Sequence, residues 1–189
     1  MKALSLNILD IIQNSIRAKA SEISVEISES DSSDIYRIKV TDNGTGIPQE
    51  IIENVTDPFV TTRTKRRMGL GLPLLKYHAE MTGGSLEIES KTGSGTKLTA
   101  SFSNHHIDRQ PLGDIVGVLI ISIAANPGIE FRYKHITDKG EYFFSSAETK
   151  EYLGITSLCE RELLDDLANM ISQNLMEIEV SGIKYKENV

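Results

Sequence analysis

The stretch that decides the fold is a strand end running into a glycine-containing loop, Val40-Thr41-Asp42-Asn43-Gly44-Thr45-Gly46-Ile47-Pro48. β-branched and aromatic residues are enriched in residues 35–40, which predicts a strand that carries Asp42 into the loop. Gly44 and Gly46 can take positive φ and let a ligand approach the backbone. Asp-Asn-Gly is also an ordinary turn sequence, so the neighbouring features decide between a plain turn and a binding site.

The composition describes a globular protein with an acidic C-terminal half. The chain has 189 residues, 39% of them hydrophobic and 25% charged, and a formal net charge of −7. This length and composition predict one medium domain, or one domain with a small appendage. Residues 107–189 hold 8 basic and 14 acidic side chains, which argues against nucleic acid as a partner.

The N-terminal segment and the cysteine content bear on where the protein works. Cys159 is the one cysteine, so an internal disulfide and a cysteine-cluster metal site are excluded. Asn7 and Asp10 interrupt the first apolar segment, which therefore does not resemble a signal peptide. The longest apolar run, residues 115–125, is too short to span a bilayer. We expect a cytoplasmic protein without a membrane partner.

The chain before the Asp42 loop predicts a helix and a hairpin. Residues 4–20 place apolar side chains at helical spacing, while Asp10, Asn14 and Arg17 recur in a row on the other side. Such a row is typical of a solvated helix face, and it also puts a carboxylate, an amide and a guanidinium together. Residues 22–27 predict a strand that pairs with residues 35–40 across a Ser- and Asp-rich turn.

Beyond the loop we expect a short helix at 49–54, an irregular segment, a second helix and two more strands. Residues 55–68 show no period and contain the basic cluster Arg63, Lys65, Arg66 and Arg67. Gly69-Leu70-Gly71-Leu72 then opens a helix to residue 81, and a glycine-rich helix start is a natural anion site. Strands at 85–90 and 96–103 complete an α/β layer.

These features, in this order, resemble the GHKL superfamily of ATP-binding domains, shared by histidine kinases, MutL mismatch-repair ATPases, type II topoisomerases and heat-shock chaperone ATPases. The resemblance covers residues 3–103. Its motifs are Asp10-Ile-Ile-Gln-Asn14-Ser15 with Ala18-Lys19-Ala20, Asp42-Asn43-Gly44-Thr45-Gly46, Pro58-Phe59-Val60-Thr61-Thr62, Gly69-Leu70-Gly71-Leu72, and Gly93-Ser94-Gly95-Thr96. The first resembles the N box, the second and fourth the glycine boxes, and the third the phenylalanine box of histidine kinases.

The resemblance implies a Bergerat-type two-layer sandwich, a mixed sheet with helices on one face, that binds ATP and magnesium. Asp42 would accept a hydrogen bond from the adenine amino group, supported by Thr96 through water, and the amide oxygen of Asn14 would bind Mg²⁺. The implied nucleotide-binding residues are Asn14, Arg17, Asp42, Gly44, Gly46, Ile47, Phe59, Thr61, Thr62, Gly69, Leu70, Gly71, Leu72 and Thr96, with Arg63, Lys65, Arg66 and Arg67 as cations of a lid over the phosphates.

Asp10 matters most for the reaction. In hydrolytic members of the superfamily a carboxylate at this position orients or deprotonates the attacking water, so an acid four residues before Asn14 makes catalysis possible. The chain departs from the family pattern twice: aspartate replaces the usual glutamate, and Arg67 stands where kinases have a glycine two residues before Gly69.

We expect a domain boundary after residue 104. Residues 105–111 predict a linker, in which His105 and His106 are more typical of exposed residues than of a metal site. Residues 112–189 predict a small α+β domain of unknown role. Its expected elements are a helix at 112–126, a hairpin of 129–136 and 141–144, a helix at 146–153, a capping box Ser157–Glu160 opening a helix to 174, and a strand at 176–185.

Three functions remain open. The first is a slow ATPase that acts as a nucleotide-dependent switch on a partner protein, which Asp10 favours. The second is a soluble protein kinase, comparable to the stand-alone anti-sigma kinases, and the third is a nucleotide sensor without turnover. The N box begins about ten residues from Met1, so we expect no phosphoacceptor helix before the ATP domain. A partner could bind through residues 112–189.

Overall fold

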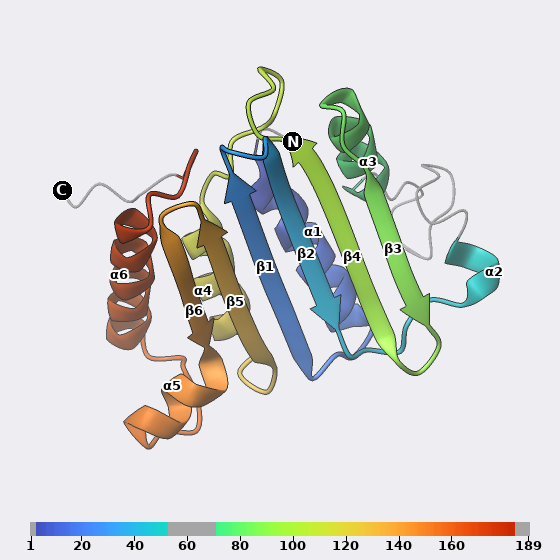
Figure 1. Cartoon of the computed structure of the whole chain (residues 1–189). Coiled ribbons are helices and arrows are strands. Elements are labelled where there is room, and N and C mark those ends of the chain that lie inside the picture. Colours follow the sequence, from blue (N-terminus) through green and yellow to red (C-terminus); the bar gives the residue numbers. More distant parts are fainter. Residues whose placement is uncertain (1–2, 53–70, 184–189) are drawn as a thin grey trace.

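The structure is a computed structural model that describes residues 3–52 and 71–183. Its strands form one mixed sheet of six, in the order β3-β4-β2-β1-β5-β6 (Figure 1). The strands are β1 (Glu22–Ser30), β2 (Ile35–Asp42), β3 (Leu86–Lys91), β4 (Gly95–Ser103), β5 (Glu130–Thr137) and β6 (Gly140–Ser145).

Helices α1, α3 and α4 lie along one side of this sheet (Figure 1). The helices are α1 (Leu4–Arg17), α2 (Gln49–Ile52), α3 (Gly71–Met81), α4 (Ile115–Ala125), α5 (Ser146–Leu153) and α6 (Arg161–Glu177). Buried side chains from the sheet and from these helices form a single hydrophobic cluster. The two-layer α/β sandwich with helices on one face is confirmed.

The β1–β2 hairpin shows why the sheet has a covered face and an open face. Burial alternates along β1, where Ile23, Val25 and Ile27 are buried and face the helices. In the antiparallel register, Ile23 lies opposite Asp42, the last residue of β2. Asp42 therefore stands at the end of the strand, where the chain leaves the sheet.

Helix α1 covers this sheet with its apolar stripe, in which Leu4, Ile8 and Ile12 are fully buried. It ends at Arg17, three residues earlier than the sequence predicts. Lys19 takes a left-handed conformation with φ of 58°, which a continuing α-helix does not allow. The early end brings residues 18–22 back under the Asp42 loop.

The C-terminal half extends the same sheet, although we expected it to form a separate small domain. Strand β5 pairs in parallel with β1, from Glu22 opposite Glu130 to Ser28 opposite Ile136. The hairpin order leaves one edge of β1 unpaired, and β5 fills it, with β6 outside. Side-chain periodicity predicts strands but not their partners, so this pairing was not visible in the sequence.

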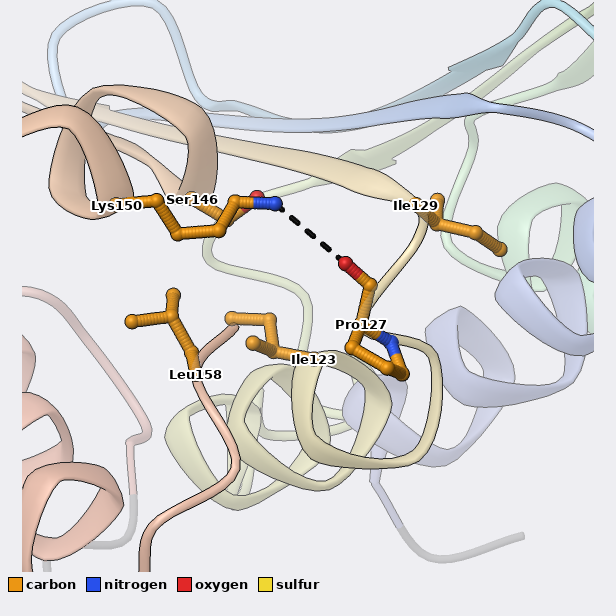
Figure 2. A pocket seen from close by; sticks show the side chains of 6 residues that line it. All are labelled: Ile123, Pro127, Ile129, Ser146, Lys150 and Leu158. Atoms are coloured by element: carbon orange, nitrogen blue, oxygen red, sulfur yellow. Dashed lines mark hydrogen bonds between the residues drawn. The ribbon is translucent and has the colours of Figure 1, made fainter. Parts of the chain in front are cut away.

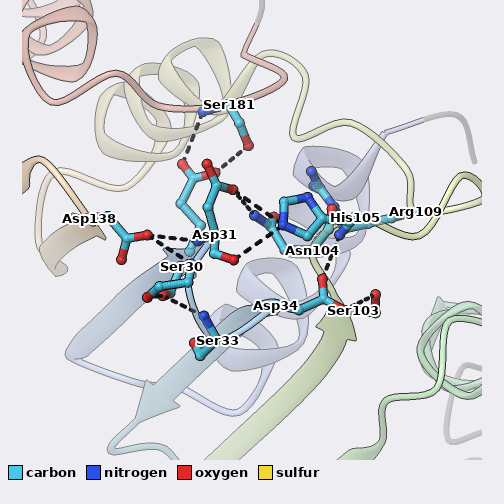
Figure 3. A network of polar contacts seen from close by, with 12 residues as sticks. Ser30, Asp31, Ser33, Asp34, Ser103, Asn104, His105, Arg109, Asp138 and Ser181 are labelled. Atoms are coloured by element: carbon cyan, nitrogen blue, oxygen red, sulfur yellow. Dashed lines mark hydrogen bonds and ion pairs between the residues drawn. The ribbon is translucent and has the colours of Figure 1, made fainter.

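Residues 104–112 form a strap across one end of the sheet, where the sequence predicted a linker (Figure 3). Asn104 donates to the Asp31 carboxylate at 2.6 Å, and the His105 N–H donates to Asp34 at 2.8 Å. The Arg109 guanidinium lies 4.5 Å from the ring centre of Tyr36. These contacts fix the strap to the β1–β2 turn and to β2.

His105 takes part in the polar contacts of the strap. Hydrogen bonds from the His105 N–H and the Ser103 hydroxyl lower the pKa of Asp34. Within residues 3–52 and 71–183, no group of three His, Cys, Asp or Glu side chains could hold a metal ion. His105 therefore lies at an anchoring contact of the strap.

Helix α6 departs from the prediction at both ends. It begins at Arg161 with Glu160 as N-cap and no side-chain capping bond, so the predicted Ser157–Glu160 capping box is not present. The helix runs to Glu177, and residues 178–183 form turns with one isolated bridge between Ile183 and Gly113. The strand predicted at 176–185 is wrong over the described residues, because Leu167, Ile171 and Leu175 continue a helical spacing that buries residue 178 as well.

Candidate functional site

Asp42 is held by one hydrogen bond on each carboxylate oxygen. The Ser15 hydroxyl donates to Oδ2 at 2.7 Å, and the Gly44 N–H donates to Oδ1 at 2.9 Å. Ser15 is buried on α1 at 2% exposure, so its position is fixed by the helix. Each carboxylate oxygen has a further lone pair, so Asp42 can accept from a ligand without releasing either donor.

Ser15 belongs to the N-box-like motif, but the sequence did not predict its contact with Asp42. Its signal was available, because Ser15 lies three and four residues after Ile12 and Ile11, on the buried stripe of α1. A hydroxyl on an apolar stripe needs a partner. Spacing alone could not name that partner, since Asp42 is 27 residues away in the sequence.

The loop after Asp42 is fixed to three neighbouring segments. The Asn43 side chain accepts from the N–H groups of Ser21 and Glu22 at 2.8 and 2.9 Å. The Thr45 N–H donates to the carbonyl of Ala18 at 2.8 Å, and the Ile47 N–H donates to the Ser90 hydroxyl at 2.8 Å. The loop is therefore a rigid edge of the site.

The glycines of this loop make close approaches to the protein's own backbone. Gly46 has φ of +69°, and a Cβ there would lie 2.1 Å from the Lys91 carbonyl oxygen. A Cβ on Gly44 would lie 2.7 Å from the Ala18 carbonyl oxygen. Both positions require glycine on these grounds alone, before any ligand is considered.

Thr96 stands beside Asp42, opposite it in the β2–β4 register. Its hydroxyl lies 2.9 Å from that of Ser90, whose own proton goes to the Gly95 carbonyl at 2.8 Å. Thr96 must therefore donate to Ser90, and its lone pairs are what it presents to water or to a ligand. This arrangement fits the expected role of Thr96 as a support for the Asp42 contact.

Asp10 and Asn14 lie one helical turn apart on α1 and face different neighbours. The amide oxygen of Asn14 accepts from the Arg17 guanidinium at 2.6 Å. The Asp10 carboxylate packs against Gly71, the first residue of α3: a Cβ on Gly71 would lie 1.9 Å from Asp10 Oδ2. The start of α3 thus comes directly to the acid that we expected to act in catalysis.

The remaining predicted residues divide into two groups. Leu72 is half buried and packs against the core, and Ile47 is half buried in the loop. The other group lies outside the described residues: Phe59, Thr61, Thr62, Arg63, Lys65, Arg66, Arg67, Gly69 and Leu70.

A small depression lies away from these residues, between α4 and α5 (Figure 2). It is lined by Ile123, Pro127, Ile129, Ser146, Lys150 and Leu158. The Lys150 ammonium points at the Pro127 carbonyl at 3.5 Å, and the Ser146 hydroxyl already donates to Glu130. With its polar groups directed at the protein itself, this depression is not the nucleotide site.

The sandwich, the Asp42 loop and the acid–amide pair on α1 together define an ATP-binding domain of the GHKL superfamily. A family model bears this out: residues 2–106 match the family described as histidine kinase-, DNA gyrase B-, and HSP90-like ATPase, and the chain belongs to it. The match covers more than half of the chain and ends within the strap.

The relatives include proteins named as kinases or sensor proteins, each similar to part of this chain. Sporulation kinase D of Bacillus subtilis (strain 168) is 37% identical over 94 residues, 49% of this chain and 18% of that protein. Sensor protein SrrB of Staphylococcus aureus (strain NCTC 8325 / PS 47) is 41% identical over 80 residues, 40% of this chain and 13% of that protein. The chain therefore spans less than a fifth of the length of these two relatives.

Two other matches cover more of this chain at lower sequence identity. The CAI-1 autoinducer sensor kinase/phosphatase CqsS of Vibrio cholerae is 26% identical over 153 residues, 78% of this chain and 22% of that protein. Among solved structures, the N-terminal domain of a DNA repair protein shares the fold with a TM-score of 0.52 and 20% identity, over 77% of this chain and 53% of that one. Within the part of the chain that the structure describes, no helix is long and apolar enough to cross a membrane.

Proposed function

We propose that this protein binds Mg²⁺-ATP through Asp42 and Asn14, hydrolyses it slowly, and acts as a nucleotide-dependent switch on a partner protein. The observation that carries the hydrolytic part is the place of Asp10. Its carboxylate lies one helical turn from Asn14 and against the first residue of α3. An acid at the phosphate end of a nucleotide site is what activation of water requires.

At the adenine end, Asp42 supplies selectivity. Its carboxylate offers only acceptors, which suit the donor amino group of adenine and repel the keto oxygen that guanine carries at the same place. The bonds from Ser15 and Gly44 hold the carboxylate in position before the base arrives. A preorganised acceptor costs less free energy to engage than one that must first be ordered.

At the phosphate end, the residues present fit a hard cation. The amide oxygen of Asn14 is a suitable ligand for Mg²⁺, which would neutralise phosphate charge when bound. Arg17, whose guanidinium donates to that oxygen, lies on an exposed part of α1. The first turn of α3 adds the N–H groups of Gly71 and Leu72 and the positive end of its dipole.

The approach of α3 supports the proposed role of Asp10. Aspartate is one methylene shorter than the glutamate usual in the family, so its reach toward a phosphate is shorter. Gly71 has no side chain, and α3 therefore comes within contact of the Asp10 carboxylate. The Asp10 side chain is shorter than glutamate, but α3, the helix that would hold the phosphates, lies correspondingly close to it.

Release of labelled phosphate tests the proposal. Purified protein is incubated with γ-labelled ATP, with magnesium and with excess chelator. The proposal expects slow release of free phosphate that depends on magnesium. Tight ATP binding with unchanged ATP over many hours would contradict hydrolysis and would favour a sensor without turnover.

A second function, phosphate transfer to a protein, is favoured by the kinases among the relatives. The same incubation in the presence of cell lysate separates the two. Label that appears in a protein band before free phosphate would identify a kinase. Free phosphate without a labelled protein would leave the switch, with residues 112–189 as the expected partner surface.

Replacing Asp42 by asparagine should weaken ATP binding by about 10- to 150-fold, the loss of a charged hydrogen bond of roughly 1.5–3 kcal/mol. The amide keeps one acceptor but must serve both Ser15 and Gly44 as well as adenine. Titration calorimetry measures the affinity. Asp166→Asn, an exposed aspartate on α6, is the matched control and should bind like the parent. Unchanged affinity in Asp42→Asn would contradict the adenine assignment.

A further inference from the structure

Residues 111 and 112 of the strap complete the start of α1. Ala3 occupies the N-cap position and offers no side-chain bond to the free N–H groups of the first turn. The carbonyl of Pro111 accepts from the Leu4 N–H at 3.0 Å, and that of Leu112 accepts from the Ser5 N–H at 2.9 Å. The strap therefore holds α1 by its main chain, and Leu112 is fully buried beneath it.

Gln110, one residue before, contacts both α1 and α3. Its Oε1 lies 3.5 Å from Asn7 Nδ2 on α1, and its Nε2 lies 3.1 Å from His78 Nε2 on α3. Asn7 is 2% exposed, so its side chain has little freedom to move. Burial lowers the pKa of His78, which keeps the ring neutral and able to accept from the Gln110 amide.

The two helices are thus joined at two separate places. One is the contact between Asp10 and Gly71, and the other is the Gln110 bridge between Asn7 and His78. His78 lies seven residues after Gly71, so the two places are about 10 Å apart along α3. Both helices also pack into the common hydrophobic core, and a second polar contact restricts their relative rotation further.

We infer that Gln110 is a positioning residue, which sets α3 against α1 and thereby places the phosphate-binding turn of α3 relative to Asp10 and Asn14. Gln110 lies beyond residue 106, where the family match ends, so the bridge belongs to this chain's own continuation of the domain. The inference rests on the proposed phosphate end of the site, but not on hydrolysis.

The test compares a nucleotide that needs both ends of the site with one that needs the adenine end. Affinities for ATP and for AMP are measured with magnesium by competition against a fluorescent nucleotide. Gln110→Ala removes the side-chain contacts to Asn7 and His78 and leaves the backbone bonds of residues 111 and 112. We expect AMP affinity within about twofold of the parent and ATP affinity about tenfold lower, because misplacement of about 1 Å can be that costly or more.

Two further variants distinguish a positioning role of Gln110 from a general effect of mutation on nucleotide affinity. Ile107→Ala changes a strap residue that is 94% exposed and should leave both affinities unchanged. His78→Ala should lower the ATP-to-AMP ratio as Gln110→Ala does, and the double variant should be no worse than either single one, because both remove the same bridge.

The outcomes of this test are distinct. A ratio unchanged in Gln110→Ala, or ATP and AMP affinities that fall together, would overturn the positioning role. Urea unfolding of each variant shows whether a common loss reflects instability. A parent protein that binds ATP without releasing phosphate would overturn the hydrolysis proposal and leave the affinity ratio fully measurable.

Discussion

Replacing Asp10 by asparagine should slow phosphate release by about 10²- to 10⁴-fold, the usual contribution of a general acid–base group, with ATP affinity nearly unchanged. The amide has nearly the same shape and keeps its packing against Gly71. It cannot accept a proton from water. Single-turnover release of labelled phosphate, at ATP concentrations above the measured dissociation constant, gives the rate of the chemical step directly.

Gly71→Ala provides a companion variant that leaves the acid in the chain. A Cβ at residue 71 would overlap Asp10 Oδ2 at 1.9 Å, so the carboxylate must move aside. Turnover should fall in this variant too, and Asp108→Asn, on the exposed strap, should be as fast as the parent. An Asp10→Asn variant as fast as the parent would rule out a catalytic role for Asp10.

The local structure around the Asp42 loop could be predicted from the sequence because its signals are local. Alternation along residues 22–27 and the β-rich composition of residues 35–40 identified the β1–β2 hairpin, and the structure lengthens the strands to Ser30 and Asp42. Asp42 and Thr96 come together because β2 and β4 are neighbours, as the resemblance implied.

Helix α5 has the predicted bounds, Ser146–Leu153, since Ser145 caps it and Gly154 ends it.

The long-range arrangement could not be predicted, since periodicity carries no information on which strands pair. The parallel pairing of β5 with β1 joins residues more than 100 positions apart and turns an expected second domain into part of the first sheet. The bonds of Ser15 to Asp42 and of Gln110 to His78 are of the same kind. The segment around Ser15 or Gln110 does not reveal these bonds, because each partner lies far away in the sequence.

The joined sheet connects the Asp42 loop with the C-terminal half through strand β1. Strand β1 leads from the Asn43 contacts at Ser21 and Glu22 to Glu29 near its far end. Glu29 in turn contacts β5 and the segment after α6. For the proposed switch, β1 is thus the element that connects the Asp42 loop with residues 112–183.

Removing the Glu29 side chain should destabilise the fold by roughly 3–5 kcal/mol, the usual cost of deleting one partner from a buried charged contact. Its carboxylate is 7% exposed and lies 3.0 Å from His135 Nε2 and 3.0 Å from the Ser181 N–H, and it also accepts from the Ser181 hydroxyl. His135 is fully buried and pairs with the Tyr133 hydroxyl at 2.6 Å. Glu29→Ala leaves these donors without their acceptor.

Urea unfolding of Glu29→Ala measures this loss against Glu26→Ala. Glu26 lies three residues earlier on β1 and pairs with Lys39 at 3.5 Å on the half-exposed face of the sheet. A surface pair of this kind contributes about 0–1 kcal/mol, so the control should unfold close to the parent. Equal midpoints for the two variants would show that the Glu29 contacts do not hold the C-terminal half to the sheet.

The same contacts predict a pH dependence. Burial alone would raise the pKa of Glu29, but hydrogen bonds from His135 and Ser181 outweigh it and lower the pKa below its ordinary value. A lowered pKa in the folded state stabilises the fold at pH above the unfolded value of about 4.3. This stabilisation is lost as the pH falls through the folded pKa. The parent should therefore lose its advantage over Glu29→Gln in acid and keep it at neutral pH, whereas a stability difference that stays constant from pH 7 to pH 3 would contradict an ionised Glu29.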